Sequence, residues 1–286
     1  MKINFKKTGK ILVQYMKKDP VGFISCIMII IFILLAIFAD YVTPYGINET
    51  QYNAVRQAPS AQHILGTDEL SRDIFSRILY ASRVSLVIGF VPTTINLIIG
   101  AILGMISGMS SKIVDTIIMR IVDVVLSYPF MILAMAIVYN LGASTKNLFL
   151  TLILVGWAGV ARTVRAQTLS LKSSTYIEAA RSMGVSKWKI MIRHILPNIR
   201  PMLMVIYTMS IPTAILSEAG LSFLGFGAQP PQTSLGVMVS KGRNYLFDAP
   251  WISLAPAIYI LVISLCLNFF GDSLRDILDP NRTEEK

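Results

Sequence analysis

The sequence predicts an all-α integral membrane protein with six transmembrane helices, on the basis of composition, apolar run length and the placement of prolines. Of its 286 residues, 54% are hydrophobic and 15% are charged, whereas soluble domains carry about a quarter charged residues. The mean hydropathy is +0.62. The 13 prolines and 18 glycines are spread through the apolar runs, which is typical of helices that are broken or bent inside lipid.

Six apolar segments are long enough to cross a bilayer, because a helix rising about 1.5 Å per residue needs about 20 residues for about 30 Å of hydrocarbon. The first follows a lysine-rich stretch that resembles a signal peptide, but it is too long for one and lacks a small-residue cleavage site. We interpret it as a retained span. The predicted spans are Val21 to Ala39, Val84 to Ser107, Ile117 to Tyr139, Leu148 to Val164, Pro201 to Leu221 and Trp251 to Phe270.

The positive charges predict the orientation of these spans. If the amino end is cytoplasmic, 19 of the 26 Lys and Arg residues lie on the cytoplasmic side, as the positive-inside rule requires. Both termini are therefore expected in the cytoplasm. The net charge of +10 does not indicate nucleic-acid binding, because the basic residues lie in short loops between spans rather than on one folded face.

No metal or cofactor site is predicted on this chain. The two cysteines, Cys26 and Cys266, lie inside apolar segments, where cysteine packs as a small hydrophobe. His63 and His194 have no ligand partners at metal-binding spacing. We expect both histidines to make ordinary polar contacts.

Two long outer loops are predicted, Asp40 to Arg83 and Ser222 to Pro250. Loops longer than about 15 residues usually have a function or contain secondary structure. In the second loop, the Pro230-Pro231 pair stops any helix, and the apolar stretch from Leu235 to Val239 predicts a short helix on or dipping into the outer surface.

The longest inner loop, Leu169 to Pro201, predicts two short helices. Thr175 and Glu178 match a capping box, which would start the first helix. Gly184 follows where a helix ends in a left-handed turn that glycine enters at little cost.

The second helix of this loop is expected to begin after Ser186, a residue type that caps helices. It should run through Ile195 and end at Pro197. From Lys172 to Arg200 the loop carries six Lys and Arg residues against one acid, Glu178. This composition predicts either a docking surface for a protein or an amphipathic element that lies on anionic lipid, with Glu178 only a cap.

The same loop resembles the EAA loop of ABC importer permeases. The resemblance rests on Glu178-Ala179-Ala180, Gly184 four residues later, and Leu196-Pro197 twelve residues beyond it. His194 stands where the family often has isoleucine, but the peptide branch often carries histidine. The resemblance implies that these residues couple the chain to an ATPase.

Two further segments extend the resemblance over essentially the whole chain. LGTDELSRDIFSR (Leu65 to Arg77), and SEAGLSFLGFGAQPPQTSLG (Ser217 to Gly236) followed by APW at Ala249 to Trp251, resemble the second permease of dipeptide, oligopeptide and nickel importers. That family implies the type I ABC importer permease fold and a multi-pass location in the bacterial cytoplasmic membrane.

The resemblance also implies the partners. A homologous second permease would form a heterodimer with this chain, two ATPase subunits would bind the EAA loops and hold ATP and Mg, and an extracellular binding protein would deliver substrate. This chain would itself have no catalytic residue. Peptide is the expected substrate, and nickel, metallophore or glutathione import by the same architecture is the alternative.

The expected organisation has three parts. Residues 1–83 comprise a cytoplasmic segment, the first span and a long extracellular loop. Residues 84–271 form a five-helix core with the coupling loop at 169–200, and residues 272–286 form a short cytoplasmic tail.

Two polar residues near or inside spans are candidate pathway residues. Glu218 lies near the outer end of the fifth span, and a carboxylate at membrane depth is costly. It either lines an outer gate or accepts hydrogen bonds from the turn at Gly220 and Gly225, and we favour the structural role. Asn96 either bonds to neighbouring helices, as is usual, or contacts the pathway.

Other classes of function fit the sequence less well. A secondary transporter needs ionisable residues at mid-membrane, but the predicted spans are nearly free of charge at their centres. A membrane enzyme is not indicated, because HExxH, GxSxG and facing acid pairs are missing. The sequence lacks GxxxxGK[ST] as well, so nucleotide must be bound by a partner.

Overall fold

The structure is a computed structural model that describes residues 19–278, and the regular elements in this range are helices. Residues 279–286 of the tail predicted at 272–286, and the basic segment at 1–18, lie outside the described residues. The elements are α2 (Pro20–Ile37), α3 (Ala39–Val42), α4 (Ile74–Met109), α5 (Lys112–Ser127), α6 (Phe130–Leu141), α7 (Thr145–Lys172), α8 (Thr175–Ser182), α9 (Lys187–Ile190), the π-helical turn η1 (Met191–Ile195), α10 (Leu196–Phe223), α11 (Leu235–Gly242), the 3-10 turn η2 (Arg243–Tyr245) and α12 (Trp251–Leu278).

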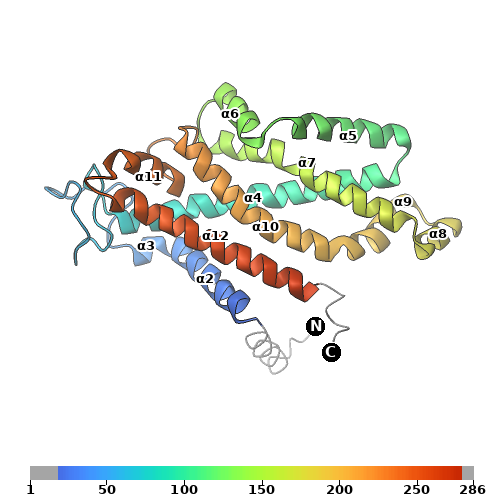
Figure 1. The fold of residues 1–286 in the computed structure, drawn as a ribbon, viewed down its shortest axis with the longest axis horizontal. Coiled ribbons are helices and arrows are strands. Elements are labelled where there is room, and N and C mark those ends of the chain that lie inside the picture. Colours follow the sequence, from blue (N-terminus) through green and yellow to red (C-terminus); the bar gives the residue numbers. More distant parts are fainter. Residues whose placement is uncertain (1–18, 279–286) are drawn as a thin grey trace.

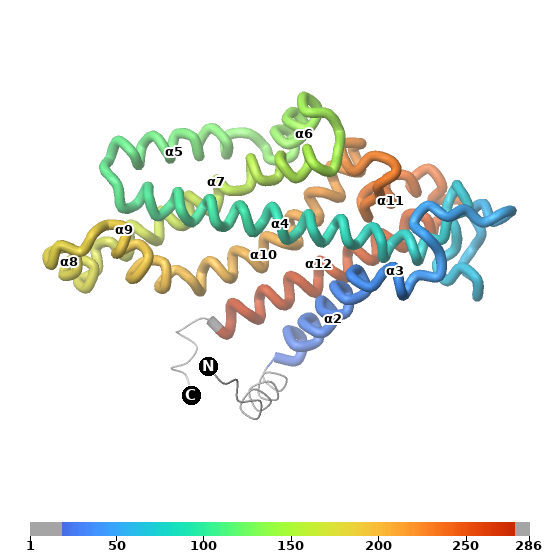
Figure 2. The backbone as a smooth tube through the Cα atoms, turned by 180° about the vertical axis from the view of Figure 1, so that it is seen from behind, coloured from blue at the N-terminus to red at the C-terminus, as the bar shows by residue number. Residues whose placement is uncertain are grey.

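The molecule is elongated, and its long helices run roughly along its length (Figure 1). The segment between α3 and α4 lies at one end together with α11, and α8 and α9 lie at the other end (Figures 1 and 2). Among the described residues, five helices are long and apolar enough to span a membrane: α2, α4, α7, the run Lys187–Phe223 and α12.

The third predicted span, Ile117 to Tyr139, is not one helix. It is split into α5 and α6, whose axes meet at 91°. Tyr128 adopts an extended conformation with φ −96° and ψ 141° because the ring of Pro129 disfavours helical backbone in the preceding residue. The two helices together form a broken span or a re-entrant segment.

Helix α4 is longer than the predicted span Val84 to Ser107. It begins at Ile74, where the Asp73 side chain accepts a hydrogen bond from the Ser76 amide at 2.8 Å. Its 36 residues measure about 54 Å at about 1.5 Å per residue, more than the hydrocarbon thickness. The first part of α4 therefore belongs to the outer loop predicted at Asp40 to Arg83.

Helices α4 and α7 pack backbone to backbone along a stripe of glycines. Gly100, Gly104 and Gly108 face Val160, Val164 and Thr168, and both sets repeat every four residues. A Cβ on Gly104 would lie 2.6 Å from the carbonyl oxygen of Ala161, closer than packed atoms allow. Small residues at this spacing let membrane helices approach closely.

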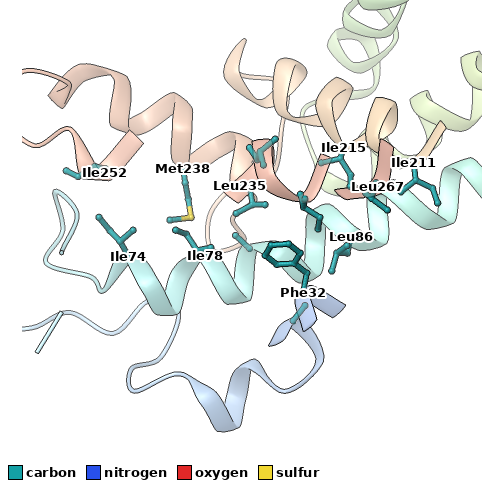
Figure 3. Close-up of a cluster of buried hydrophobic side chains, with 14 of the residues drawn as sticks. Phe32, Ile74, Ile78, Leu86, Ile211, Ile215, Leu235, Met238, Ile252 and Leu267 are labelled. Carbon is teal, nitrogen blue, oxygen red and sulfur yellow. The ribbon is translucent and has the colours of Figure 1, made fainter. Parts of the chain in front are cut away.

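The half of the bundle that carries α11 has a core in which four long helices meet this short helix (Figure 3). Leu235 and Met238 point from α11 toward Ile78 of α4, and both are buried. The predicted short helix in the second outer loop is therefore confirmed, and its apolar face is covered by protein. The buried cluster consists of Phe32, Ala36, Ile74, Ile78, Ala81, Leu86, Ile211, Ile215, Leu235, Met238, Ala249, Ile252, Ile260, Ile263 and Leu267.

The segment between α3 and α4 is held by buried charges. Asp68 accepts hydrogen bonds from the Arg72 side chain at 2.8 Å, and lies 3.4 Å from Arg77. The His63 and Asp73 side chains pair at 2.9 Å while both are almost fully buried. These pairs fix a segment that contains little regular structure.

Candidate functional site

The predicted coupling loop at 169–200 contains α8, α9 and η1, at the end of the molecule farthest from α11 (Figure 1). Gly184 separates α8 from α9 with φ +78°, and the Val185 amide donates to the Ala180 carbonyl at 3.1 Å. This is the Schellman pattern. The predicted left-handed turn at Gly184 is confirmed.

The predicted capping box at the start of α8 is wrong. Ser174, not Thr175, is the N-cap, and no side chain caps the helix. The Ser174 hydroxyl instead donates to the Leu171 carbonyl at 2.6 Å, which turns the chain into α8 one residue earlier than expected. The Glu178 side chain is left exposed and makes no hydrogen bond or ion pair with any described residue.

Buried apolar residues fasten this loop to the ends of α4, α7 and α10. Ile177 on α8 is 1% exposed, Ile190 is 1% exposed and Ile195 is fully buried. They pack with Met105 and Met109 of α4, among others. The loop is therefore part of the bundle rather than a flexible connection.

The opposite face of the loop is open. Ala179 is exposed beside Glu178, whereas Ala180 is buried. Met183 is 76% exposed and Trp188 is 62% exposed. The basic residues of the loop that are exposed with them are Arg181, Lys187, Lys189 and Arg193. Large apolar side chains among cations form a surface suited to a protein partner.

The prediction that Pro197 ends the second helix is wrong. Lys187–Phe223 is one helical run of 37 residues, in which Pro197 lies in the first turn of α10. Because the run is continuous, the absence of an N–H on Pro197 removes one hydrogen bond from the helix, and this occurs directly after the π-helical turn η1, where the hydrogen bonding is already irregular. Leu196 is half-buried and Pro197 is exposed.

His194 lies on η1 and contacts the first helix of the loop. Its ring is 6.4 Å from the ring of Tyr176 on α8, centroid to centroid. Its carbonyl accepts a hydrogen bond from the Asn198 side chain at 2.6 Å. His194 therefore links α8 to the start of α10 through a loose aromatic contact.

Two aspartate–arginine pairs join α5 to α7 just inside this end. Arg165 holds Asp115 with two nitrogens, one of them at 2.6 Å, and Arg162 pairs with Asp123. Arg120 lies one helical turn before Asp123 on α5, a spacing at which side chains can pair, but α5 packs along α7 and Asp123 pairs with Arg162 instead. Lys172 donates to the carbonyl of Gly108 at 3.1 Å, which ties the ends of α4 and α7.

A groove of about 350 Å³ lies among α4, α6, α7 and α10, and none of its lining side chains is charged. Asn96 lines it and donates to the Leu152 carbonyl at 3.0 Å. The Asn96 Oδ1 atom has no hydrogen-bond partner among the described residues. The lining residues are Pro92, Thr93, Asn96, Leu97, Phe130, Leu152, Gly156, Val160, Ile206, Tyr207, Ser210, Thr213, Ala214 and Ser217.

Glu218 is 1% exposed and does not line the groove. Its carboxylate accepts hydrogen bonds from Ser222 at 2.6 Å and from Ser85 at 3.3 Å. Ser222 lies 3.4 Å from Ser234, the N-cap of α11. The partners are serine hydroxyls rather than the turn at Gly220 and Gly225, because Glu218 faces α4 and α11. This geometry supports the structural role.

The glycine stripe and the serines around Glu218 were not predicted as functional features. The four-residue repeat of Gly100, Gly104 and Gly108 is visible in the sequence and could have indicated a helix–helix contact. The serines come from α4, from α10 and from the residue that precedes α11, so no local pattern reveals them.

The chain matches two families. Residues 100–284 match the binding-protein-dependent transport system inner membrane component family. Residues 9–59 match the N-terminal TM domain of oligopeptide transport permease C. The first match covers well over half of the chain.

Several curated relatives match nearly the full length. The chain is 41% identical to the dipeptide transport system permease protein DppC of Alkalihalophilus pseudofirmus, over 93% of this chain and 88% of that protein. It is 41% identical to the glutathione transport system permease protein GsiD of Escherichia coli O6:K15:H31, over 92% and 88%. It is 39% identical to the probable D,D-dipeptide transport system permease protein DdpC of Escherichia coli K12, over 95% and 91%.

Solved structures of similar fold include two inward-facing crystal forms of the MetNI methionine ABC transporter. Their TM-scores are 0.57 and 0.56, at 20% sequence identity in both cases. The matches cover 68% and 71% of this chain, and 93% and 96% of the matched chains. The likeness shows a shared helical fold.

We predict that Glu218→Ala lowers the free energy of unfolding by about 1–3 kcal/mol, because it leaves buried serine hydroxyls without their acceptor. Thermal unfolding of the purified chain measures this. Glu178→Ala, which removes the same side chain at an exposed position, should change it by less than about 0.5 kcal/mol. Unchanged melting of Glu218→Ala together with lost transport would instead identify a gate residue.

Proposed function

This chain belongs to the family of binding-protein-dependent transport system inner membrane components, and we propose that it is the second permease of an ATP-driven peptide importer. The observation that carries the proposal is the continuity of Lys187–Phe223. One end of this run forms the exposed face of the coupling loop, and its membrane part lines the uncharged groove with six residues of α10, from Ile206 to Ser217.

In this proposal, a homologous second permease completes the pathway. Two ATPase subunits, which hold ATP and Mg, dock on the coupling loops of the two permeases, and an extracellular binding protein delivers substrate to the end that carries α11. This chain itself has no catalytic, metal or cofactor role. Asn96 is a proposed pathway contact, supported by its position in the groove and its unpaired Oδ1 atom.

We infer six spans and two cytoplasmic termini, with α5 and α6 counted as one broken span. The part of the chain from α4 to α12 corresponds to the proposed five-helix core, although the expected boundaries at 83/84 and 271/272 fall inside α4 and α12. The type I importer fold is supported by the likeness to the methionine transporter.

A thiol-labelling experiment tests this topology in a variant without native cysteines. A cysteine at Tyr52, which is 97% exposed between α3 and α4, should react with an impermeant maleimide in intact cells. A cysteine at Met183, which is 76% exposed on the coupling loop, should react only after lysis. The reverse pattern would overturn the orientation.

For the substrate we propose short peptides. The relatives named for dipeptides and for glutathione, itself a tripeptide, are almost equally similar to this chain. A groove without charged side chains suits substrates of varied sequence, because it neither attracts nor repels a particular side-chain charge. Glutathione import is the second candidate.

The substrate proposal predicts ATP-dependent uptake of a labelled dipeptide into proteoliposomes that contain the complete importer and its binding protein. Excess unlabelled glutathione added to the same vesicles reports whether the tripeptide competes. Vesicles prepared without this chain are the control. Hydrolysis of ATP without uptake of either compound would argue against peptide import.

The coupling loop offers a matched pair of glycines for a test of ATPase docking. Gly184 and Gly225 have φ +78° and +92°, and a Cβ on either would meet no atom within 4 Å. Each turn has the same hydrogen bond, from Val185 to Ala180 or from Phe226 to Leu221. Valine should therefore add a similar backbone strain of roughly 1–2 kcal/mol at both positions.

We expect Gly184→Val to weaken ATPase retention about 30-fold, which corresponds to an interface hot spot of about 2 kcal/mol. Gly225→Val, at the other end of the molecule, should retain the ATPases. Co-purification of the ATPase subunits with each variant measures this. Full retention and wild-type uptake by Gly184→Val would favour the lipid-surface interpretation of the loop.

A further inference from the structure

A second groove, of about 360 Å³, lies between α2 and α4 and shares no lining residue with the first. It forms because α2 turns one face toward α12, where Phe32 packs edge-on against Tyr259 at 4.9 Å. The neighbouring face of α2 then stands beside α4 without filling the space. The groove is lined by Ile33, Ala36, Ile37, Arg83, Leu86, Val87, Phe90 and Val91.

The length of this groove matches the outer leaflet. Its α4 lining residues run from Arg83 to Val91, a rise of about 12 Å, against about 15 Å for half of the hydrocarbon core. Helix α2 ends at Ile37, beside α3 and toward the end of the molecule that carries α11 (Figure 1). Phe38 and Tyr41 follow it, 48% and 87% exposed, as is typical of aromatic residues at the membrane interface.

Both signs of charge meet at the mouth of the groove. Arg83 donates to the Ile37 carbonyl at 2.9 Å and to the Asp40 carboxylate at 2.7 Å. The two side chains are 33% and 60% exposed. The Nε of Arg83 also donates to the Ala36 carbonyl, so its Nη1 is the nitrogen that has no hydrogen-bond partner among the described residues and can donate to another ligand. The hydrogen bond from Arg83 holds the pKa of Asp40 below its usual value, so Asp40 stays ionised at neutral and mildly acidic pH.

We propose that this groove binds one outer-leaflet phospholipid with a zwitterionic phosphoethanolamine headgroup. The phosphate accepts hydrogen bonds from Arg83, the ammonium contacts Asp40, and one acyl chain lies against the apolar lining. The charges at the groove favour this lipid, because a phosphoethanolamine headgroup carries both an anion for Arg83 and a cation for Asp40. A transmembrane helix of another protein fits less well, because its apolar surface would cover the Arg83–Asp40 ion pair and remove its hydration.

The lipid site goes beyond the proposed transport function and is tested without transport. The purified full-length chain is mixed with equal amounts of phosphatidylethanolamine and phosphatidylglycerol that carry the same acyl chains, and retained lipid is read by native mass spectrometry. Phosphatidylethanolamine should be retained up to about fivefold better, the preference that an exposed ion pair of up to about 1 kcal/mol gives. Equal retention would overturn the headgroup assignment.

Two matched variants distinguish lipid bound in the groove from lipid bound elsewhere on the exposed apolar surface. Val87→Trp fills the groove at a position that is 48% exposed, and Leu261→Trp adds the same side chain on α12 at a position that is 55% exposed. Val87→Trp should lose the retained lipid while Leu261→Trp keeps it. Asp40→Asn should remove the preference for phosphatidylethanolamine.

Thermal unfolding of each variant verifies the fold. Retention of lipid by folded Val87→Trp would refute the site. A photo-crosslinking residue at position 87 in membranes that contain the assembled importer should attach to lipid. Attachment to the companion permease would show a protein helix in the groove and would also refute the site.

Discussion

Because glycines let the backbones of α4 and α7 touch, these two helices form the axis on which the other elements are placed. Inside a bilayer the hydrophobic effect does not drive helices together, so close van der Waals packing has to stabilise their contact. Side chains at Gly100, Gly104 or Gly108 would push the helices apart. Arg165 on α7 and Ser107 on α4 then share the carboxylate of Asp115, which fixes α5 on this axis.

The coupling loop takes its rigidity from the same axis. Ile177 and Ile190 are buried against residues that include Met105 on α4 and Val164 on α7, so α8 and α9 cannot move independently of these helix ends. Through η1, α9 also continues into α10 without an intervening loop. A displacement of the exposed face of the loop is therefore transmitted to the wall of the groove through one helical run. The backbone hydrogen bonding of this run is least regular at the π-helical turn η1.

Features governed by chain length or by a single backbone conformation were predictable from the sequence. The spans follow from hydrocarbon thickness, and the turn at Gly184 follows from the tolerance of glycine for positive φ. Whether an individual proline breaks a helix was not predictable from the sequence. Pro129 breaks a span, whereas Pro92 and Pro212 lie inside continuous helices, because neighbouring helices decide whether the freed backbone groups are accommodated.

The ion-pair and hydrogen-bond partners of side chains could not be predicted from sequence spacing either. Arg120 is one turn from Asp123 along α5, yet Asp123 pairs with Arg162 across the helix contact. Glu218 was recognised as a costly carboxylate, but its hydrogen-bond partners come from α4 and α10 and connect to α11. Such contacts depend on how the helices are packed, which no local window of sequence contains.

The uncharged lining of the groove beside Asn96 also bears on electrical insulation. A small ion that enters such a passage loses its hydration shell, and no fixed charge of the opposite sign repays the several kcal/mol or more that this costs. A larger solute that carries its own hydrogen-bonding groups meets hydroxyls from Thr93, Ser210 and Thr213. In the proposed pathway, the lining that offers hydroxyls to a polar solute therefore also presents a dielectric barrier to metal cations.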